Sequence, residues 1–567
     1  MESDSDVRFP DDFNLADYFL FDRIRDGFTD DPALRFGDRS WTYGEVAERS
    51  RALARWLVED GLGPEQRVYI VLPDIPPFAW GIFATLAAGG ILTMGNPQAP
   101  PGDLEYVLDY VRARVLITTP AVAQSLAPAL ARLPHLASIL LAPDAVTGDD
   151  PEATCELPSD VVASGKRALS LDRAIDHALS STRALPRTRR DDPCVWLFTS
   201  GSTGRPKAAM HTHRDFAFNT EVYARRTIGY RREDVTVSVP RLFFGYATGT
   251  NLWFPFAVGA CVALFSERPS AETLAAAIAR YRPTVVTNVP TMLGKLLDFD
   301  DERRARGEPG LDLSSVRFHL SAGEALPPAL LERFAARFGG DVYDGIGSAE
   351  MFHIYCSNRP GDIVPGSLGR AVDGYTLKIL PEEAEGPGAP PVPPGDIGIL
   401  WVKGDSVALG YFQDRDKSWR TFHGHWCRTG DLFRIDERGY LWFSGRSDDL
   451  FKVGGIFVAP LEVEECLLGH PAVSLAAVIP ADDAGLTKPK AFVVVRPEHR
   501  ARIAGDAGRT ALAAELVEHV KGHLARYKFP RWIEFVDDLP RNDRGKVDRK
   551  LLRDREAAAA PVDRGKA

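Results

Sequence analysis

The sequence predicts an α/β protein, with a large N-terminal domain of mixed and parallel sheets flanked by helices and a small α+β C-terminal domain. Two observations predict this class. Short apolar runs of strand type, such as 67–72, 115–119 and 284–288, alternate with stretches rich in alanine and leucine. The length of 567 residues, with 45% hydrophobic content, is ample for more than one domain.

The pattern restarts after Gly445 with short strands and two helical stretches, 461–468 and 511–527. About 120 residues suit a small independent domain. We therefore expect domains at 1–447 and 448–567. Earlier in the chain, residues 142–190 are polar and rich in Asp, Pro and Ser, which predicts a surface excursion before the Ser/Gly loop described below.

Residues 75–100 contain no charge and are long enough to span a membrane. Two elements explain them better. Pro76 and Pro77 mark a helix start, 78–88 forms a buried helix, and two glycines separate it from a buried strand at 91–94. The sequence therefore predicts no membrane segment.

Composition excludes some classes of partner. A net charge of −10 and a pI near 5.7 argue against a nucleic-acid surface, which needs a basic patch. The six cysteines show no metal or redox spacing, which predicts free thiols in the cytoplasm. The acidic residues 1–6 do not form a signal peptide. Monomer and homodimer both stay open.

The most informative stretch is 198–207, which combines hydroxyls, two glycines and a cation after a buried strand. Glycines with φ > 0 let backbone N–H groups close on an anion. The alternative is an exposed Ser/Gly linker, and the preceding apolar strand argues against it. We predict that the phosphate-binding residues are Thr199, Ser200, Gly201, Ser202, Thr203, Gly204 and Lys207.

Four further segments follow in a fixed order: 343–350, 428–431, 445–449 and 540–546. With the Ser/Gly loop, they make nearly the whole chain similar to the acyl-adenylate-forming enzymes. That family comprises acyl- and aryl-CoA synthetases, firefly-type luciferases and the adenylation domains of peptide synthetases. The resemblance implies ATP, Mg²⁺ and coenzyme A as cofactors.

The resemblance also implies roles for single residues. The loop would hold the β- and γ-phosphates, and Glu350 would ligate Mg²⁺, whose preference for oxygen suits a carboxylate. Asp431 would accept both ribose hydroxyls, and Arg446 would face the ribose. The other nucleotide-binding residues would be Gly323, Glu324, Tyr343, Asp344 and Gly345.

Adenylation brings a carboxylate and a phosphate together, so the site needs positive charge. By resemblance, the ammonium of Lys546 bridges the two anions in the first half-reaction. The small domain then rotates about the hinge residue Asp448 and removes the lysine. Gly454 and Gly455 would line the tunnel for coenzyme A.

A narrower resemblance, to benzoate-CoA ligases, is carried by 242–249, 321–326 and 344–353. It implies a flat apolar slot for an aromatic ring. Gly245 stands where these ligases tend to have alanine, which hints at a substituted benzoate such as 2-aminobenzoate. His353 would approach the carboxylate or a ring substituent, or serve only as a structural histidine. The substrate residues are Phe244, Gly245, Tyr246, Ala322, Ile346, Gly347 and His353.

Two positions depart from the family pattern, because Ala349 and Asn542 each replace a common threonine. The first substitution removes a donor and predicts slower turnover. It also motivates an alternative of another class, a non-catalytic nucleotide sensor. A second alternative is an aryl-adenylating enzyme that loads a carrier protein. Nothing in the sequence specifically supports a luciferase-type oxygenase.

Overall fold

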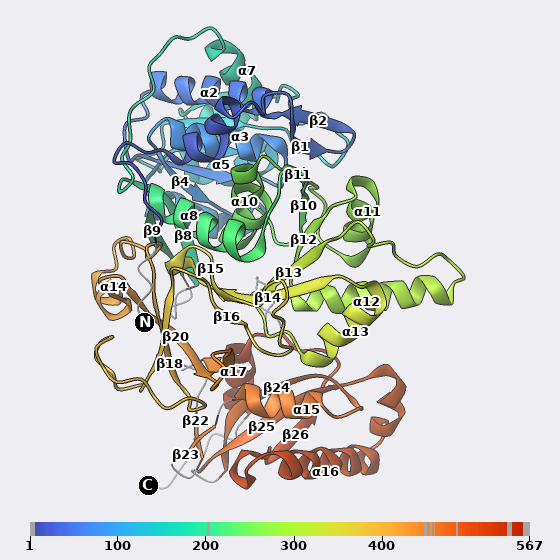
Figure 1. Ribbon diagram of the computed structural model, residues 1–567. Helices are drawn as coiled ribbons and strands as arrows, with labels where there is room; N and C mark the ends of the chain where they lie inside the picture. Colours follow the sequence, from blue (N-terminus) through green and yellow to red (C-terminus); the bar gives the residue numbers. More distant parts are fainter. Residues whose placement is uncertain are drawn as a thin grey trace, which may run out of the picture. The chain divides into compact units, whose positions relative to one another are not determined.

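The computed structural model describes residues 6–200, 205–446, 451–453, 456–458, 460–483, 486–540 and 547–559. The chain divides into two compact units, Met1–Leu377 with Trp401–Arg428 and Lys378–Leu400 with Thr429–Ala567 (Figure 1). The α/β class with a smaller second part is confirmed. The predicted boundary at 447/448 lies outside the described residues and stays a prediction, as does the mobility of the second part.

The first unit contains a sheet in the order β7-β6-β5-β3-β4-β8-β9, parallel except for the pair β8 and β9. Apolar side chains point to both faces of its central strands. Ile70 and Ile117 meet α3 on one face, while Tyr69 and Val71 belong to the core formed with α4 and α5 on the other. The strands are β3 (Arg67–Val71), β4 (Ile91–Met94), β5 (Ala113–Thr118), β6 (Ser138–Leu141), β7 (Arg167–Ser170), β8 (Pro193–Ser200) and β9 (Pro206–Thr212).

The helices of this sheet begin at recognisable signals. A capping box of Thr42 and Glu45 starts α2 (Tyr43–Glu59). Two prolines start α3 (Pro76–Ala87), which is buried along its whole length and leads into the buried strand β4. The prediction for 75–100 is confirmed, and no helix among the described residues is long and apolar enough to cross a membrane. The opposite face carries α4 (Pro101–Tyr110) and α5 (Pro120–Leu130).

The segment 142–190, predicted as a surface excursion, includes regular elements that the sequence did not predict. It contains α6 (Ser159–Ala163), the edge strand β7 and α7 (Leu171–Ala178). In α7 the buried side chains are Leu171, Ala174, Ile175 and Ala178, which share one helical face. The helical period was present in the sequence, and the polar composition of the rest of the segment obscured it.

A second sheet runs in the order β16-β15-β14-β13-β12-β10-β11-β1-β2. Its core packs α11 (Ala271–Tyr281), α12 (Pro290–Ala305) and α13 (Pro328–Phe338) against β10, β12 and β14. The strands are β1 (Pro32–Phe36), β2 (Arg39–Thr42), β10 (Val235–Ser238), β11 (Cys261–Leu264), β12 (Val285–Asn288), β13 (Phe318–Ala322), β14 (Asp341–Gly347), β15 (Ile354–Ser357) and β16 (Arg370–Ala371).

Shorter helical elements complete the first unit. They are η1 (Asp17–Phe21), α1 (Asp22–Arg25), α8 (His213–Asn219), η2 (Thr220–Ile228), α9 (Gly245–Thr248), η3 (Gly249–Trp253), α10 (Phe254–Val258), η4 (Ala349–Met351) and α14 (Arg415–Thr421). A further sheet has the order β17-β18-β20-β19, with β21 paired to β20. Its strands are β17 (Thr376–Leu380), β18 (Gly398–Lys403), β19 (Phe422–His423), β20 (Trp426–Ile435) and β21 (Leu441–Arg446).

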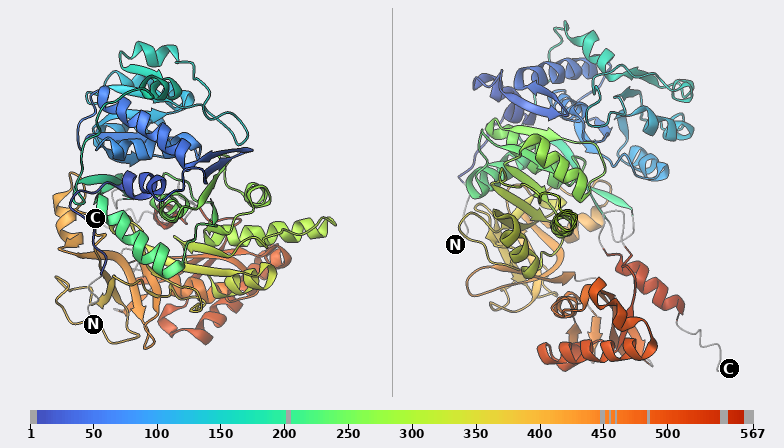
Figure 2. Two further views of the ribbon diagram at one scale, coloured as in Figure 1. Left: turned by 45° about the horizontal axis from the view of Figure 1, so that its top comes forward. Right: turned by 90° about the vertical axis from the view of Figure 1, so that its right-hand side faces the viewer.

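The second unit has a three-stranded sheet of β24 (Val473–Asp483), β25 (Leu486–Val495) and β26 (Trp532–Phe535). One face packs on α15 (Pro460–Leu468) and α16 (Asp506–His523), and the other on α17 (Arg549–Ala559) (Figure 2). The remaining elements are β22 (Phe451–Val453), β23 (Ile456–Val458), η6 (Pro497–Ile503) and η7 (Arg526–Lys528).

The first predicted helix of the second unit, 461–468, is confirmed as α15. The second, predicted over 511–527, is displaced: α16 begins at Asp506 and ends at His523. Leu524 has extended backbone angles, and this ends the helix before the 3-10 turn η7. The bounds differ because the two ends carry no strong stop signal in the sequence.

Candidate active site

Parallel strands bring three predicted segments to one edge of the nine-stranded sheet. β10, β12, β13 and β14 run in the same direction, so their carboxyl ends share that edge. Residues 244–246 follow β10, Gly323 and Glu324 follow β13, and Ile346 and Gly347 end β14. In open α/β sheets, ligands bind at the carboxyl ends of the strands. This edge is therefore the candidate active site of the first unit.

The Ser/Gly loop connects β8 and β9, which pair as an antiparallel hairpin with Thr199 opposite Lys207. Residues 201–204 lie outside the described residues. Lys207 Nζ lies 2.6 Å from Asp414 Oδ2. Burial raises the pKa of Asp414, but the hydrogen bond from Lys207 outweighs it together with the other donors and leaves the pKa below its ordinary value. Lys207 is thus in an ion pair, and its contact with phosphate stays a prediction.

Glu350 lies on η4, just after β14. The Tyr411 hydroxyl donates to Glu350 Oε1 at 2.7 Å, and the Ala408 N–H donates to the Glu350 carbonyl at 2.9 Å. Burial, with the nearby Glu350 carboxylate, raises the pKa of Tyr411, so the phenol keeps its proton. Mg²⁺ prefers carboxylate and other oxygen ligands. The half-buried, oriented carboxylate of Glu350 therefore fits the predicted metal role.

Two residues that position Glu350 were not predicted from the sequence. The segment that carries Tyr411 runs beside β9, where the Met210 N–H donates to the Gly410 carbonyl at 2.9 Å. His211 on β9 is buried, with Nδ1 2.9 Å from Asp215 Oδ2 and Nε2 2.6 Å from the carbonyl oxygen of Ala349. Both ring nitrogens therefore face acceptors. His211 fixes the backbone of η4 at the position where the side chain of Ala349 lacks a hydroxyl.

β13 and β14 place the segments predicted to enclose adenine side by side, with Ser321 opposite Asp344. Asp344 is buried, and burial raises its pKa to about 8. The Asp344 carbonyl accepts from the Asn358 N–H and side-chain amide at 2.9 and 3.0 Å. The backbone of this segment is thus held firmly, while its carboxyl group is kept protonated near neutral pH.

Two other residues predicted to bind the nucleotide, Glu324 and Tyr343, form hydrogen bonds with other side chains of the protein. Glu324 Oε2 accepts from the Thr291 hydroxyl at 2.7 Å, in the first turn of α12, where a carboxylate is favourable. The Tyr343 hydroxyl donates to Asp341 Oδ2 at 2.8 Å. Gly323 has a φ of 90°, which suits glycine. Contact of these residues with a nucleotide stays a prediction.

Two predicted site glycines are required by the pairing of β14 with β15. A Cβ on Gly345 would lie 2.8 Å from the Cys356 carbonyl oxygen, and one on Gly347 would overlap the His353 backbone. Ile346 lies opposite Cys356 in the same ladder, and Ala322 on β13 lies opposite Gly345. These glycines therefore allow close strand approach, which is a structural reason independent of any ligand.

His353 follows η4 and lies in an aromatic environment. The rings of Tyr223, Tyr246 and Phe254 lie 5.7, 5.4 and 4.7 Å from its centroid. Its Nε2 lies 3.0 Å from the Tyr246 carbonyl oxygen, which can only accept, so Nε2 carries the proton. Burial lowers the pKa of His353 to about 4. Nδ1 is then an acceptor, and it has no hydrogen-bond partner in the part of the chain that the structure describes.

The room for this histidine comes from Gly249, since a Cβ there would overlap the His353 ring. The Tyr246 hydroxyl is also buried without a partner among the described residues. Phe244, by contrast, is 36% exposed. A Cβ on Gly245 would lie 3.1 Å from Leu197 Cδ1 on β8, so this glycine packs against the first sheet. This contact is a second reason why a glycine stands at position 245. The first is the predicted space for a ring substituent.

The loop before Phe244 is anchored by Asp74, another residue that was not predicted from the sequence. Asp74 Oδ1 accepts from the Leu242 N–H at 3.0 Å, and Oδ2 lies 3.6 Å from Arg241. Burial raises the pKa of Asp74 to about 6, against the opposing effect of Arg241. Asp74 lies between β3 and α3, so its contacts connect the loop before Phe244 to the seven-stranded sheet.

In the second unit, Asp431 on β20 lies opposite Arg446 on β21. The two residues predicted to contact the ribose are therefore cross-strand neighbours in the backbone. Asp448, Gly454, Gly455 and Lys546 lie outside the described residues. Their roles as hinge, tunnel and catalytic lysine stay predictions.

Two family models match the chain: the AMP-binding enzyme model over residues 21–412 and the AMP-binding enzyme C-terminal domain model over residues 462–546. Among curated proteins, the benzoate–CoA ligase of Thauera aromatica is 38% identical and covers 96% of this chain and 97% of its own. The anthranilate–CoA ligase of Pseudomonas aeruginosa is 32% identical, with 87% of this chain and 87% of its own covered.

Solved structures agree with these matches. The crystal structure of the anthranilate CoA ligase AuaEII in complex with anthranoyl-AMP has a TM-score of 0.85 and 34% identity, covering 98% of this chain and 99% of that one. The benzoate CoA ligase from Burkholderia xenovorans has a TM-score of 0.80 and 36% identity, covering 95% and 100%.

Proposed function

The chain belongs to the AMP-binding enzyme family, and we propose that its preferred acid is a benzoate with a hydrogen-bond donor beside the carboxylate, such as 2-aminobenzoate. It is an AMP-forming aryl-CoA ligase, with ATP and coenzyme A as co-substrates. Its relatives act on benzoate and on anthranilate, so they support an aromatic acid and leave the ring substituent to be argued from the chain itself.

The observation that carries the proposal is the buried acceptor on His353. Nε2 donates to the Tyr246 carbonyl, and burial keeps the ring neutral, so the Nδ1 lone pair faces its surroundings without a partner among the described residues. A buried acceptor left unpaired costs about 1–3 kcal/mol. A ligand with a donor next to the ring removes that cost, whereas unsubstituted benzoate does not.

This difference sets the expected selectivity. A gain of about 1.4 kcal/mol corresponds to a tenfold preference. Sites that hydrogen-bond a substrate group reject analogues lacking it more strongly than apolar pockets reject an analogue lacking a methylene. We therefore expect 2-aminobenzoate to be preferred to benzoate by about tenfold or more in kcat/KM. A methyl group in place of the amine fills similar space and donates no hydrogen bond, so 2-methylbenzoate serves as the matched acid.

The reaction has two steps. A carboxylate oxygen forms a bond to the α-phosphorus of ATP, the bond to the bridging oxygen breaks, and pyrophosphate leaves. The sulfur of coenzyme A then forms a bond to the acyl carbon, AMP leaves with the electron pair of the mixed anhydride, and the thiol proton passes to solvent. Mg²⁺, when bound, supplies positive charge to the phosphates, and Glu350 would hold it.

The residues of this chain have separate tasks in those steps. Tyr411 orients Glu350 through its hydroxyl, and His211 holds the backbone of η4. Asp431 and Arg446 are proposed to bind the ribose, and the Ser/Gly loop to bind the phosphates. For the residues outside the described chain, we propose that Lys546 bridges the two anions, that Asp448 is the hinge, and that Gly454 and Gly455 meet the thiol arm.

Three further points concern the acyl acceptor, the cellular compartment and the oligomeric state. A carrier-protein phosphopantetheine is an alternative acceptor to free coenzyme A, and a partner protein would have to supply it. We place the protein in the cytoplasm, because all six cysteines are without disulfides. The oligomeric state stays open between monomer and homodimer.

The test is reconstitution with ATP and Mg²⁺, one acid at a time, and either coenzyme A or a carrier protein, with products identified by mass. We expect 2-aminobenzoyl-CoA to form fastest, with 2-methylbenzoate and benzoate slower. An equal or higher rate with benzoate would refute the substrate proposal while leaving the ligase activity intact. Acyl transfer only to the carrier protein would establish that alternative, and binding of ATP without any product would establish the nucleotide sensor.

A further inference from the structure

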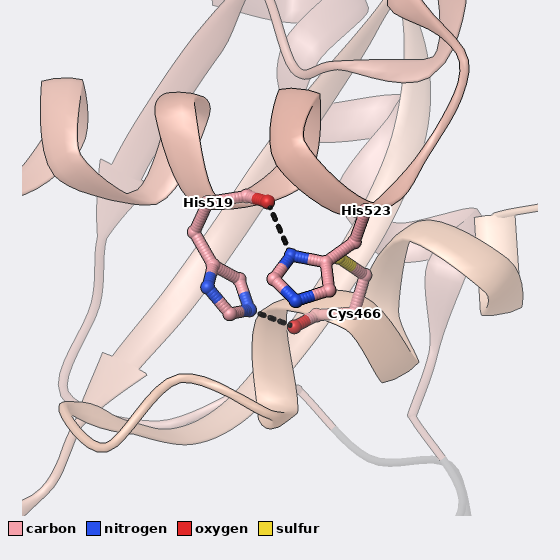
Figure 3. Close-up of side chains that lie close together, drawn as sticks. All are labelled: Cys466, His519 and His523. Carbon is pink, nitrogen blue, oxygen red and sulfur yellow. Dashed lines mark hydrogen bonds between the residues drawn. The ribbon is translucent and has the colours of Figure 1, made fainter.

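A cysteine and two histidines of the second unit lie close together on the helices α15 and α16. Cys466 lies on α15, and His519 and His523 lie one turn apart on α16 (Figure 3). One ligand atom from each residue lies within 4.8 Å of the others. The spacing i, i+4 places both imidazoles on the same helical face.

We propose that Cys466, His519 and His523 form a binding site for a transition-metal dication of the Zn²⁺ type. Imidazole nitrogens and a thiolate are the ligands that select such ions over Mg²⁺. In a tetrahedral zinc site the ligand atoms lie about 3.3–3.7 Å apart, as follows from Zn–N and Zn–S bonds of about 2.0–2.3 Å. Binding therefore requires each side chain to move by about 1 Å or less.

The hydrogen bonds around the cluster support this assignment. His523 Nδ1 lies 2.8 Å from the His519 carbonyl oxygen, so Nδ1 carries the proton and Nε2 is the nitrogen with a lone pair. Metal-bound histidines usually donate their other N–H to such a carbonyl. His523 thus already has the tautomer and the supporting hydrogen bond of a metal ligand.

His519 needs one change. Its Nε2 lies 3.0 Å from the Cys466 carbonyl oxygen and faces the cluster, so this nitrogen donates in the metal-free protein (Figure 3). Metal binding replaces that hydrogen bond: the proton of Nε2 passes to solvent, solvent protonates Nδ1, and the ring stays neutral. The Cys466 thiol proton also passes to solvent. Burial lowers the pKa of His519, which favours the neutral ring that a metal needs. Burial also raises the pKa of Cys466, and a bound dication would offset this by stabilising the thiolate.

A neighbouring histidine is excluded by its partners. The ring of His470 lies 5.3 Å from that of His519. However, His470 Nδ1 accepts from the Ala472 N–H at 3.2 Å, and Nε2 lies 3.0 Å from Glu515 Oε1. Both nitrogens of His470 are therefore engaged. His523 is exposed, so solvent water can supply the fourth ligand.

The site would link α15 to α16, the two helices that cover one face of the three-stranded sheet. Cys466 packs at the edge of that core, beside the buried residues of both helices. A metal ion that binds only the folded state stabilises it. We therefore expect Zn²⁺ to raise the melting temperature of the second unit, whatever acid the enzyme prefers.

The experiment is a titration of the chelator-treated full chain with Co²⁺, a spectroscopic probe for zinc sites, in excess Mg²⁺. We expect one equivalent to bind with a thiolate-to-cobalt charge-transfer band, which Zn²⁺ then abolishes by displacement. Cys466→Ser should lose the band, and His523→Ala should weaken binding by about tenfold or more. Circular dichroism without metal checks that each variant is folded.

Two matched variants complete the design. Cys155→Ser removes another partly exposed thiol, and His499→Ala removes a histidine of the second unit outside the cluster, so both should bind Co²⁺ as the parent does. Mass spectrometry after alkylation should show that Zn²⁺ protects Cys466 and leaves Cys155 reactive. The proposal is overturned if the parent binds no stoichiometric Co²⁺, if Cys466→Ser keeps the band, or if His523→Ala binds as tightly as His499→Ala.

Discussion

Glu350 and His353 lie three residues apart between β14 and β15, yet they have opposite environments. Glu350 is half-buried and held by polar partners, with the Tyr411 hydroxyl on its carboxylate and Ala408 on its carbonyl. His353 is surrounded by aromatic rings and leaves Nδ1 without a partner among the described residues. One short segment therefore carries a carboxylate that the protein has oriented and a histidine whose buried acceptor we propose to be completed by a ligand.

The difference separates two kinds of task. The role proposed for Glu350 at the phosphates is the same for every acid, so we expect the fold to set the orientation of this carboxylate. A buried acceptor without a hydrogen bond distinguishes one acid from another, because only an acid with a donor group can form that hydrogen bond. Changes at Glu350 should lower the rate for all acids, and changes at His353 should alter the ratio between acids.

Glu350→Gln should have the largest effect. Losing one charged group that stabilises the transition state costs about 2.7–4 kcal/mol, or about 100- to 1000-fold in rate. We expect that loss in pyrophosphate release, equally for benzoate and 2-aminobenzoate. Thioester formation from supplied aryl-AMP should change much less. An equal loss in both half-reactions would show that Glu350 acts on structure and not on the phosphates.

Asp344, on β14 just before this segment, adds a prediction that depends on pH. Its folded-state pKa of about 8 lies above the ordinary value of 3.8, so the folded protein retains the proton longer than the unfolded chain. This contribution to stability is complete below about pH 4 and is lost as the pH rises through about 8, at about 1.4 kcal/mol per pH unit. Asp344→Asn should remove that slope.

The measurement for Asp344 is the free energy of unfolding at about pH 5 and about pH 8. The parent should lose stability relative to Asp344→Asn over this interval. Parallel pH profiles for the two proteins would mean that Asp344 titrates normally.

Tyr411→Phe should have a smaller effect than Glu350→Gln, because the carboxylate remains. A hydrogen bond to a charged group contributes about 1.5–3 kcal/mol, so adenylation should slow by about tenfold or somewhat more. Both acids should lose alike, as read from kcat/KM, with the melting temperature as control. A change in the ratio between the two acids would mean that Tyr411 affects substrate selectivity and does not act only by orienting Glu350.

Gly245→Ala should have the smallest effect on the ratio between acids. The added methyl would meet Leu197 Cδ1 at 3.1 Å on β8, and overpacking of this kind costs about 1–3 kcal/mol of stability. We expect a lower melting temperature and a ratio of kcat/KM values for 2-aminobenzoate and benzoate that changes by less than about twofold. A tenfold fall confined to 2-aminobenzoate would instead support the room for a ring substituent that the sequence suggests.

Local signals predicted the elements well. The two prolines at the start of α3 and the charge-free run 75–100 predicted a buried helix and strand, and the carboxyl ends of β13 and β14 carry the predicted segments. The helix α7 within 142–190 was not predicted, because polar residues masked its helical period. The predicted boundaries of α16 were wrong, because the two ends of this helix carry no strong stop signal in the sequence.

The partners in the site could not be read from spacing. His211 lies 138 residues from the Ala349 carbonyl that it holds, and Tyr411 lies 61 residues from Glu350. The ion pair of Lys207 with Asp414 likewise depends on how the chain passes beside β9. The pattern of residue types predicts that a carboxylate or a lysine is functional, and only the folded arrangement shows which side chains orient or neutralise it.

The account depends most directly on His353, and the decisive measurement is the ratio of kcat/KM for 2-aminobenzoate to that for benzoate in the parent and in His353→Phe. Phenylalanine keeps a ring and removes both nitrogens. His319→Phe is the matched control, since His319 is also buried but its Nδ1 lies 3.1 Å from the Asn288 amide. We predict that the ratio falls about tenfold or more in His353→Phe and stays unchanged in His319→Phe. An unchanged ratio in His353→Phe, or an equal loss for both acids, would contradict the account.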